Sequence, residues 1–276
     1  YSSDETIYVY GVYEMLYGYH YLKRPYELVP RAAEKVVVPT YYDKDGKELP
    51  ADVDSRLIAR AVYRIPIKKG MKFAPHPAFA KDDKGNYLYH HLRAEEASKL
   101  KSPLDLPARG TREVTAEDFV YGIKRMGSPV VVSPVLGMMA NHIEGLKDFA
   151  DNLSREAKKL RESGDTSWLD LRKYEISGVR AADRYTIEIT LSGKYNQFSN
   201  WLSMAFFAPV PWEAEAFYHN EGFKENNISL ATWPVGAGPF MLTKSLVNRE
   251  HVLERNPNYR FEPYPCEGMP ADEEKG

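Results

Sequence analysis

A capped helix gives the strongest local constraint on how this 276-residue chain folds. In the stretch VTAEDFVYGIKRM, Thr115 is a natural N-cap, and Asp118 stands three residues on, where its carboxylate can accept a hydrogen bond from the cap's backbone N–H. Acidic residues at the start and Lys124 and Arg125 at the end suit the helix dipole. We therefore predict a helix that stops before Pro129. Its predicted core-facing residues are Phe119, Val120, Ile123 and Met126.

The rest of the chain mixes helices and strands without a regular β-α-β rhythm. Alternation after the Asp45-Gly46 turn predicts a strand within residues 61–67 that ends at Lys68-Lys69-Gly70. No sustained period runs through residues 74–112, which we interpret as a long, partly ordered excursion. Further predicted helices are residues 4–17, one or two within 142–162, 195–208 before Pro209, and 212–222. Further predicted strands are a short buried one at 36–38, the hairpin 178–191, and two within 236–260 joined around Asn248-Arg249. Together they predict a mixed α/β or α+β fold.

Charge and composition argue against several classes of protein. The chain has 37 basic and 39 acidic residues, whereas a nucleic-acid binder usually concentrates a basic excess on one face. No window approaches about 18 consecutive apolar residues, so no transmembrane helix is predicted. The single cysteine, Cys266, excludes an internal disulfide, and we interpret it as an incidental thiol. The 20 tyrosines suit both half-buried core edges and binding clefts.

Motifs for covalent or metal chemistry are absent from the sequence. There is no phosphate-binding loop, no serine elbow and no metal-binding H-E-x-x-H helix. The Gly236–Gly238 run matches only part of a dinucleotide fingerprint, and Pro239 leads it into a strand rather than a helix. The side chains of His90 and His91 point in opposite directions if the chain is extended, so the pair is a poor chelate. We therefore interpret them as polar surface residues rather than as ligands of a metal site completed by His76. We assign no catalytic residue, no metal ligand and no cofactor.

Five stretches, in the same order, resemble motifs of the family 5 extracellular solute-binding proteins, which are the oligopeptide- and dipeptide-binding components of ABC importers. They are VYRIPIKKGMKF (62–73), VTAEDFVYGIKR (114–125), GVRAADRYTIEITL (178–191), FFAPVP (206–211) and the stretch from GAGPF to NPNYR (236–260). The resemblance implies a type II periplasmic binding protein fold, with an incomplete ligand-binding lobe and an accessory domain.

The resemblance also implies a division of the chain. Residues 1–14 and 178–261 would form part of ligand-binding lobe I, and residues 15–177 an accessory domain with a long insertion at 74–112. Residues 262–276 would begin the connection to a second lobe, so the chain is expected to be the N-terminal portion of a longer protein, with a strand before Tyr1. Two departures stand out. The insertion is longer than in better-known members, and Arg260 replaces a common aromatic residue, which we interpret as a surface or hinge detail.

By resemblance, the protein captures a peptide or similar small solute between two lobes and delivers it to an ABC transporter permease. It would be periplasmic, or extracellular as a membrane-tethered lipoprotein, and would meet the membrane only through the permease. Ligand contacts both lobes only in the closed state, so we expect very weak binding by this chain alone. The alternatives are a non-peptide ligand, such as a metal complex, haem or sugar, and a peptide hydrolase.

The ligand-binding residues implied by the resemblance are Tyr1, Ser2 and Ser3. In relatives, the segment before the first helix lines the cleft, and its backbone groups would pair with an extended peptide. The competing interpretation is a frayed chain terminus. The residues that grip ligand termini in relatives would belong to the second lobe.

Overall fold

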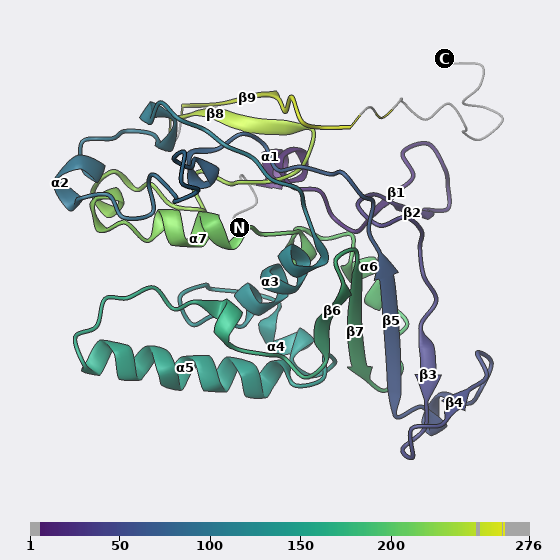
Figure 1. The fold of residues 1–276 in the computed structure, drawn as a ribbon. Helices are drawn as coiled ribbons and strands as arrows, with labels where there is room; N and C mark the ends of the chain where they lie inside the picture. Colours follow the sequence, from purple (N-terminus) through teal and green to yellow (C-terminus); the bar gives the residue numbers. More distant parts are fainter. Residues whose placement is uncertain (1–5, 247–248, 261, 263–276) are drawn as a thin grey trace, which may run out of the picture.

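An antiparallel sheet of five strands forms the lower right of the molecule in Figure 1, in the order β4-β3-β5-β7-β6. The structure is a computed structural model that describes residues 6–246, 249–260 and 262. Strands β5 and β7 pair along their full length, from Arg60 opposite Ser192 to Pro66 opposite Thr186. The strands of this sheet are β3 (Thr40–Tyr42), β4 (Glu48–Leu49), β5 (Arg60–Pro66), β6 (Val179–Asp183) and β7 (Thr186–Ser192).

The two faces of the sheet follow from the alternation of residue types. On one face, Ile187, Ile189 and Leu191 of β7 are completely buried. On the other face, Glu188 accepts hydrogen bonds from the Nε atoms of Arg64, at 2.8 Å, and of Arg180, at 2.9 Å, on the two flanking strands. The predicted strand at 61–67 and the predicted hairpin at 178–191 are therefore confirmed.

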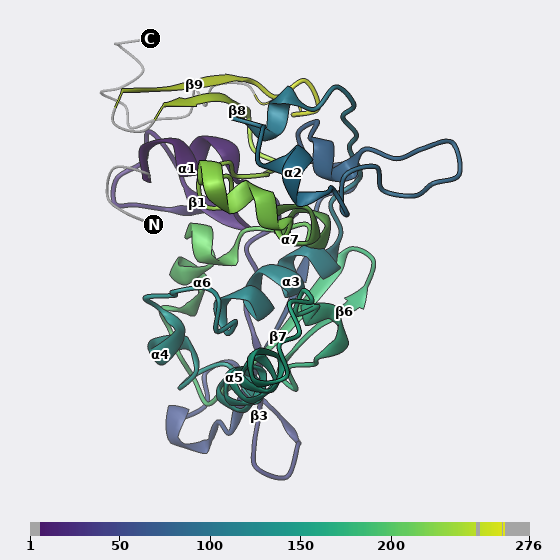
Figure 2. The ribbon, with the colours of Figure 1, turned by 90° about the vertical axis from the view of Figure 1, so that its left-hand side faces the viewer.

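Helix α3 (Ala116–Met126) packs against β6 and β7, and the predicted cap is present. The backbone N–H of Thr115 donates to Oδ2 of Asp118 at 2.8 Å, and all four predicted core-facing residues are buried. Below α3 in Figures 1 and 2 lies α5 (Leu146–Glu162), preceded by the single turn α4 (Leu136–Met139). The predicted helical region 142–162 is thus one helix, and it buries Leu146, Phe149 and Leu153.

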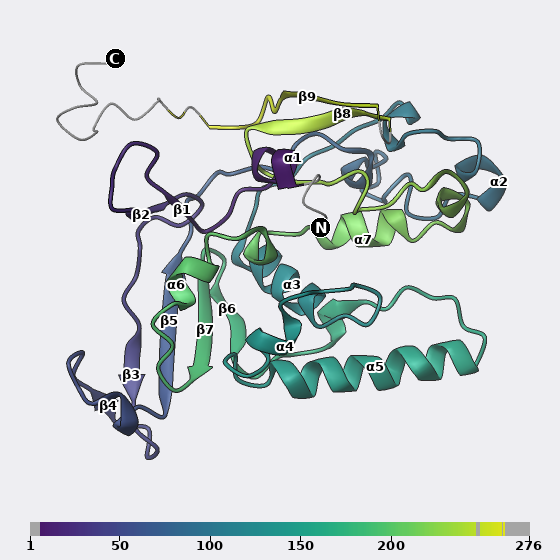
Figure 3. The ribbon, with the colours of Figure 1, turned by 180° about the vertical axis from the view of Figure 1, so that it is seen from behind.

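A second layer lies above the sheet and is capped by a two-stranded ribbon, which all three ribbon views show over α1 (Figures 1–3). Its strands and helices are α1 (Thr6–Val12), β1 (Tyr17–Tyr19), β2 (Leu28–Pro30), α2 (Ala94–Ala97), α7 (Trp212–Tyr218), β8 (Phe240–Leu246) and β9 (Glu250–Arg255). The predicted helix at 212–222 and the predicted strands within 236–260 are confirmed. Among the described residues, no helix is long and apolar enough to cross a bilayer.

The long segment 74–112 has no extended helix or strand, as predicted, yet it is anchored by its own apolar cluster. Its short elements are the 3-10 turns Pro77–Phe79 and Pro103–Asp105 and the single turn α2. Ala78, Ala97 and Leu106 pack with Phe217 of α7 and Phe223 just beyond it. The segment therefore packs mainly on the upper layer, while Phe79 joins the core that contains the sheet residues.

The glycines of the GAG run allow two backbone segments to approach closely. A Cβ atom on Gly236 would lie 2.0 Å from the carbonyl oxygen of Val12, and one on Gly238 would lie 2.6 Å from that of Gly11. The turn after β9 fastens the same place, because Nδ2 of Asn256 donates to the carbonyl of Gly238 at 2.9 Å. The run is thus a packing device between α1 and β8.

Arg260 is not a surface detail, so that part of the interpretation is wrong, and its assignment to a hinge stays a prediction. Its guanidinium forms an ion pair with Glu14, whose side chain is 2% exposed. Tyr259 also donates to Glu14, at 3.3 Å. The NPNYR turn therefore supplies the counter-charge for a buried carboxylate that follows α1.

Three predicted elements differ from the structure. Residues 36–38 form no strand: Val36 and Val38 are 39% and 78% exposed, and β3 begins only after Pro39. The predicted helix at 195–208 is instead the single turn α6 (Phe198–Trp201) and a 3-10 turn (Ala205–Phe207), because the backbone at Met204 is extended. Helix α1 ends at Val12 rather than at 17.

The division into lobe and accessory domain stays a prediction. The five-stranded sheet spans both sides of its boundary at residues 177 and 178, since β5 pairs with β7. The described residues on the two sides of the boundary also share one large apolar core.

Candidate ligand-binding cleft

A hollow of about 670 Å³ lies between the C-terminal half of α5 and residues 165–169 on one side and α7 with residues 219–231 on the other. A neighbouring inner pocket of about 220 Å³ continues it toward α3. We call the two together the α5–α7 cleft. They share the wall residues Arg125, Val130, Val131, Leu230 and Ala231.

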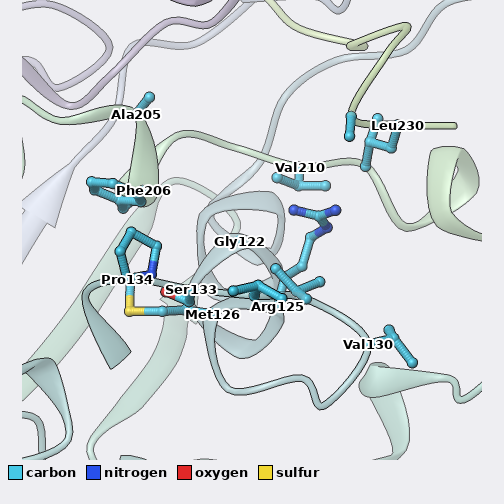
Figure 4. Close-up of a pocket in the computed structure, with 13 residues that line it drawn as sticks. Gly122, Arg125, Met126, Val130, Ser133, Pro134, Ala205, Phe206, Val210 and Leu230 are labelled. Atoms are coloured by element: carbon cyan, nitrogen blue, oxygen red, sulfur yellow. The ribbon is translucent and has the colours of Figure 1, made fainter. Parts of the chain in front are cut away.

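Most of the residues that line the inner pocket are of apolar type, and its one cationic side chain is Arg125 (Figure 4). Gly122, Arg125 and Met126 come from α3, and the guanidinium of Arg125 points toward Val210 and Leu230 on the opposite side. Gly122 is required here, because a Cβ atom would lie 2.4 Å from the carbonyl oxygen of Ala208. The remaining wall residues are Val130, Val131, Val132, Ser133, Pro134, Ala205, Phe206 and Ala231.

Exposed apolar side chains and an unsatisfied hydroxyl mark this pocket. Val130 and Val132 are 74% and 96% exposed, which costs free energy in water unless something covers them. The Oγ atom of Ser133 is buried and has no hydrogen-bond partner among the described residues. These features suit a ligand that brings apolar surface and at least one polar atom.

The outer part of the cleft has charges of both signs. Arg125 forms an ion pair with Glu215 of α7 where the two parts meet. Other polar and charged residues in the walls are Arg161, Asp165, Thr166, Ser167, His219, Glu221, Lys224 and Ser229. A ligand with both positive and negative groups would find partners here.

Three contacts hold α7 beside residues 166–172. Nε2 of His219, at the end of α7, lies 2.7 Å from the carbonyl oxygen of Thr166. Trp168 stacks on Trp212 with ring centroids 6.0 Å apart, and the guanidinium of Arg172 lies 3.6 Å from the Trp212 centroid. Such cation–π and stacking contacts fix the spacing of the walls.

A buried ionic network holds α3 and α7 in place behind the cleft. Arg112 donates to Glu213 at 2.6 and 2.7 Å and to Asp118 at 2.9 and 2.6 Å. Tyr87 adds a hydrogen bond to Glu213 at 3.1 Å. Burial alone would lower the pKa of Arg112, but the hydrogen bonds from its guanidinium to the two carboxylates outweigh it and raise the pKa. The guanidinium is therefore a permanent cation between them.

The residues predicted from sequence to contact ligand, Tyr1, Ser2 and Ser3, lie outside the described residues, as does Cys266. Two of the three histidines considered for a metal site, His76 and His90, have other partners. Nδ1 of His76 accepts from the N–H of Ala78 at 3.1 Å, and Nε2 of His90 lies 2.9 Å from the Ala78 carbonyl oxygen. Among the described residues, no group of three or more His, Cys, Asp or Glu is placed to hold a metal ion.

Comparison with known proteins identifies the family. The profile described as bacterial extracellular solute-binding proteins, family 5 Middle, matches residues 110–268, which is more than half of the chain. The chain belongs to family 5 of the bacterial extracellular solute-binding proteins. The recognition made from five sequence stretches is thereby confirmed.

Two curated members of family 5 illustrate the range of similarity. The periplasmic oligopeptide-binding protein OppA of Salmonella typhimurium is 31% identical over 147 residues, and the probable deoxycholate-binding periplasmic protein YgiS of Escherichia coli is 29% identical over 147. Each match covers 53% of this chain and 23% of the relative. The chain thus matches about a quarter of the length of these relatives.

The fold is that of solved family 5 structures. The murein tripeptide binding protein MppA of Escherichia coli superposes with a TM-score of 0.53 at 19% identity, covering 94% of this chain and 35% of that one. The predicted mixed α/β fold of the type II periplasmic binding protein class is therefore confirmed. The relatives are binding proteins rather than enzymes, and those named above are periplasmic.

Sequence reasoning missed the α5–α7 cleft. Its residues come from four separate stretches, none of which carries a motif of its own. One local signal was available: Val130, Val131 and Val132 lie between Pro129 and Pro134, where neither a helix nor a paired strand can bury them. An apolar run that local structure cannot bury indicates a surface covered by something else.

Proposed function

We propose that this chain forms part of a solute-binding protein that captures peptides for an ABC importer. Membership of family 5 supports the class, and OppA and MppA are named for an oligopeptide and a murein tripeptide. The observation that carries the proposal is the α5–α7 cleft, whose apolar inner pocket continues into an outer part with charges of both signs. A peptide offers both apolar side chains and charged termini, so it matches this arrangement.

The proposed mechanism needs no covalent step. A peptide that contacts this chain and a second lobe in the closed state, but only one of them in the open state, shifts the equilibrium toward closure. The closed form then presents the peptide to a membrane permease. The periplasmic location, or a lipid-tethered extracellular one, and the absence of enzymatic activity belong to the same proposal.

One observation favours a second ligand class. The inner pocket combines mostly apolar lining residues with the buried Oγ atom of Ser133, which has no partner among the described residues, and this suits an amphipathic molecule with a polar group. YgiS is named as a probable deoxycholate-binding protein. No observation on the described residues favours a metal complex, haem, a sugar or a peptide hydrolase.

The test is an NMR titration of this chain with unlabelled tripeptides and pentapeptides, and separately with deoxycholate below its micellar concentration. We expect dissociation constants on the order of 1 mM or weaker, because one side of a two-sided site is present. The backbone amides that shift should be those of 130–133, 205–206 and 229–231.

A matched pair of variants locates the binding. Val131→Asp places a charge in the wall shared by both parts of the cleft, whereas Val38→Asp places the same charge on a side chain that is 78% exposed elsewhere. Peptide shifts should be lost in the first variant and kept in the second. Shifts produced by deoxycholate alone would favour the second ligand class. Peptide shifts confined to other surfaces, or equal in both variants, would overturn the proposal.

A further inference from the structure

A separate cavity of about 330 Å³ lies between α3, the turn around Leu171 and the start of α7. Its lining residues are Glu117, Asp118, Tyr121, Lys124, Arg172 and Trp212. None of these six belongs to the walls of the α5–α7 cleft as defined by the described residues. The cavity is therefore a site of its own, with a different chemical character.

Two nearly buried donors in this cavity lack acceptors. Tyr121 is 4% exposed, and its hydroxyl has no hydrogen-bond partner among the described residues. Lys124 is 8% exposed and forms no ion pair or hydrogen bond with any described residue. Burial lowers the pKa of the Lys124 ammonium, although Glu117, Glu175 and Asp170 act in the opposite direction from a distance. A buried hydroxyl without an acceptor is costly, and the Lys124 ammonium, which reaches the solvent-accessible space of the same cavity, also has no acceptor among the described residues.

The acceptors around the cavity are already occupied or lie at its rim. Asp118 accepts from Arg112 and from the backbone of Thr115. Arg172 is held by Asp170 through two hydrogen bonds, at 2.9 and 2.7 Å. Glu117 is exposed on the first turn of α3. The unused hydrogen-bonding capacity of the interior therefore consists of donors, which require an acceptor from outside.

We propose that this cavity binds a small oxyanion, a carboxylate or a phosphate, which accepts hydrogen bonds from the Lys124 ammonium and the Tyr121 hydroxyl. The ring of Trp212 forms one wall, and the guanidinium of Arg172 adds positive potential. A bound oxyanion would join α3 to the Leu171 turn and to α7. It would thereby stabilise the frame on which the α5–α7 cleft is built.

The experiment is a calorimetric titration of the purified chain with acetate, succinate and inorganic phosphate in turn, at constant ionic strength set by chloride. We expect saturable binding of at least one of them. Lys124→Met should weaken it about 10-fold or more, because a charge-assisted hydrogen bond is lost. Lys158→Met, on the exposed face of α5, is the matched control and should bind like the unmodified chain. Preference for acetate and succinate assigns a carboxylate, and preference for phosphate assigns a phosphate.

A second variant tests whether the weaker binding of Lys124→Met arises from misfolding. Tyr121→Phe removes only the unpaired hydroxyl, so in chloride-containing buffer without oxyanions its urea midpoint should equal or exceed that of the unmodified chain, while oxyanion binding weakens. The proposal is overturned by a lowered midpoint of Tyr121→Phe, by no saturation at concentrations on the order of 100 mM, or by undiminished binding in Lys124→Met. The oxyanion result can be told apart from peptide binding, because the cavity shares no lining residue with the α5–α7 cleft and the calorimetric titration contains no peptide.

Discussion

Replacement of Arg112 by methionine is predicted to destabilise the fold strongly, because one guanidinium balances two buried carboxylates. Asp118 and Glu213 are 3% and 2% exposed and accept four hydrogen bonds from Arg112. Removing one partner of a buried ion pair usually costs about 3–5 kcal/mol, since the other charge stays buried without compensation. Asp118 keeps the N–H of Thr115 and Glu213 keeps the hydroxyl of Tyr87, so we expect about 4 kcal/mol.

Urea unfolding followed by circular dichroism measures this loss. With a slope of about 3 kcal/mol per molar, the midpoint should fall by roughly 1 M. The loss should also depend on pH. Burial already raises the pKa of Asp118, and Arg112 opposes this rise; without Arg112 the folded-state pKa rises further, so protonation relieves the cost as pH falls. The difference between variant and unmodified chain should therefore be smaller at pH 5 than at pH 8.

Two further variants make the reasoning refutable. Arg93→Met removes an arginine whose side chain is 78% exposed and should leave the urea midpoint unchanged. The triple variant Arg112→Met, Asp118→Asn, Glu213→Gln removes all three charges and should recover part of the lost stability. A loss below about 1 kcal/mol for Arg112→Met, or a triple variant no more stable than the single one, would show that the network does not hold α3 and α7 together.

Three other predictions concern packing, protonation and the buried carboxylate beside α1. Gly236→Ala should lower the free energy of unfolding, measured with urea, by about 3 kcal/mol, because its Cβ would lie 2.0 Å from a carbonyl oxygen of α1. The control Gly137→Ala, in open space on α4, should raise it by up to about 1 kcal/mol. Burial lowers the pKa of His76 to about 3, so stability should fall by about 1.4 kcal/mol per pH unit from pH 6.5 downward, and His76→Asn should flatten that dependence. Arg260→Ala should lower the free energy of unfolding by about 2 kcal/mol, because Glu14 then keeps only the hydroxyl of Tyr259 and the more distant Arg31; an unchanged midpoint would contradict this.

Features fixed by near neighbours in the chain were predicted correctly. They are the Asp118 cap of α3, the core face of that helix and the β6–β7 hairpin. Each depends on residues within about a dozen positions of one another, where hydrophobic periodicity and capping determine the local structure. The order of five such stretches was enough to identify the family, because order and spacing add information that no single stretch has.

Features that depend on distant segments were not predictable in the same way. Val36–Val38 have strand-forming side chains but no partner strand, and the apolar stretch around Phe198 splits into two short turns because the core it fills requires an extended residue at Met204. The role of Arg260 likewise appeared only once Glu14 was placed beside it.

The sequence by itself determined the family, the mixed α/β class and most of the regular elements, because these rest on local propensity and on the order of motifs. Tertiary structure alone decided that β5 pairs with β7, that residues 74–112 pack on α7, and where the α5–α7 cleft and the cavity beside Lys124 lie. Each of these joins residues that are far apart in the chain, and their proximity follows from burying apolar surface and pairing charges in three dimensions.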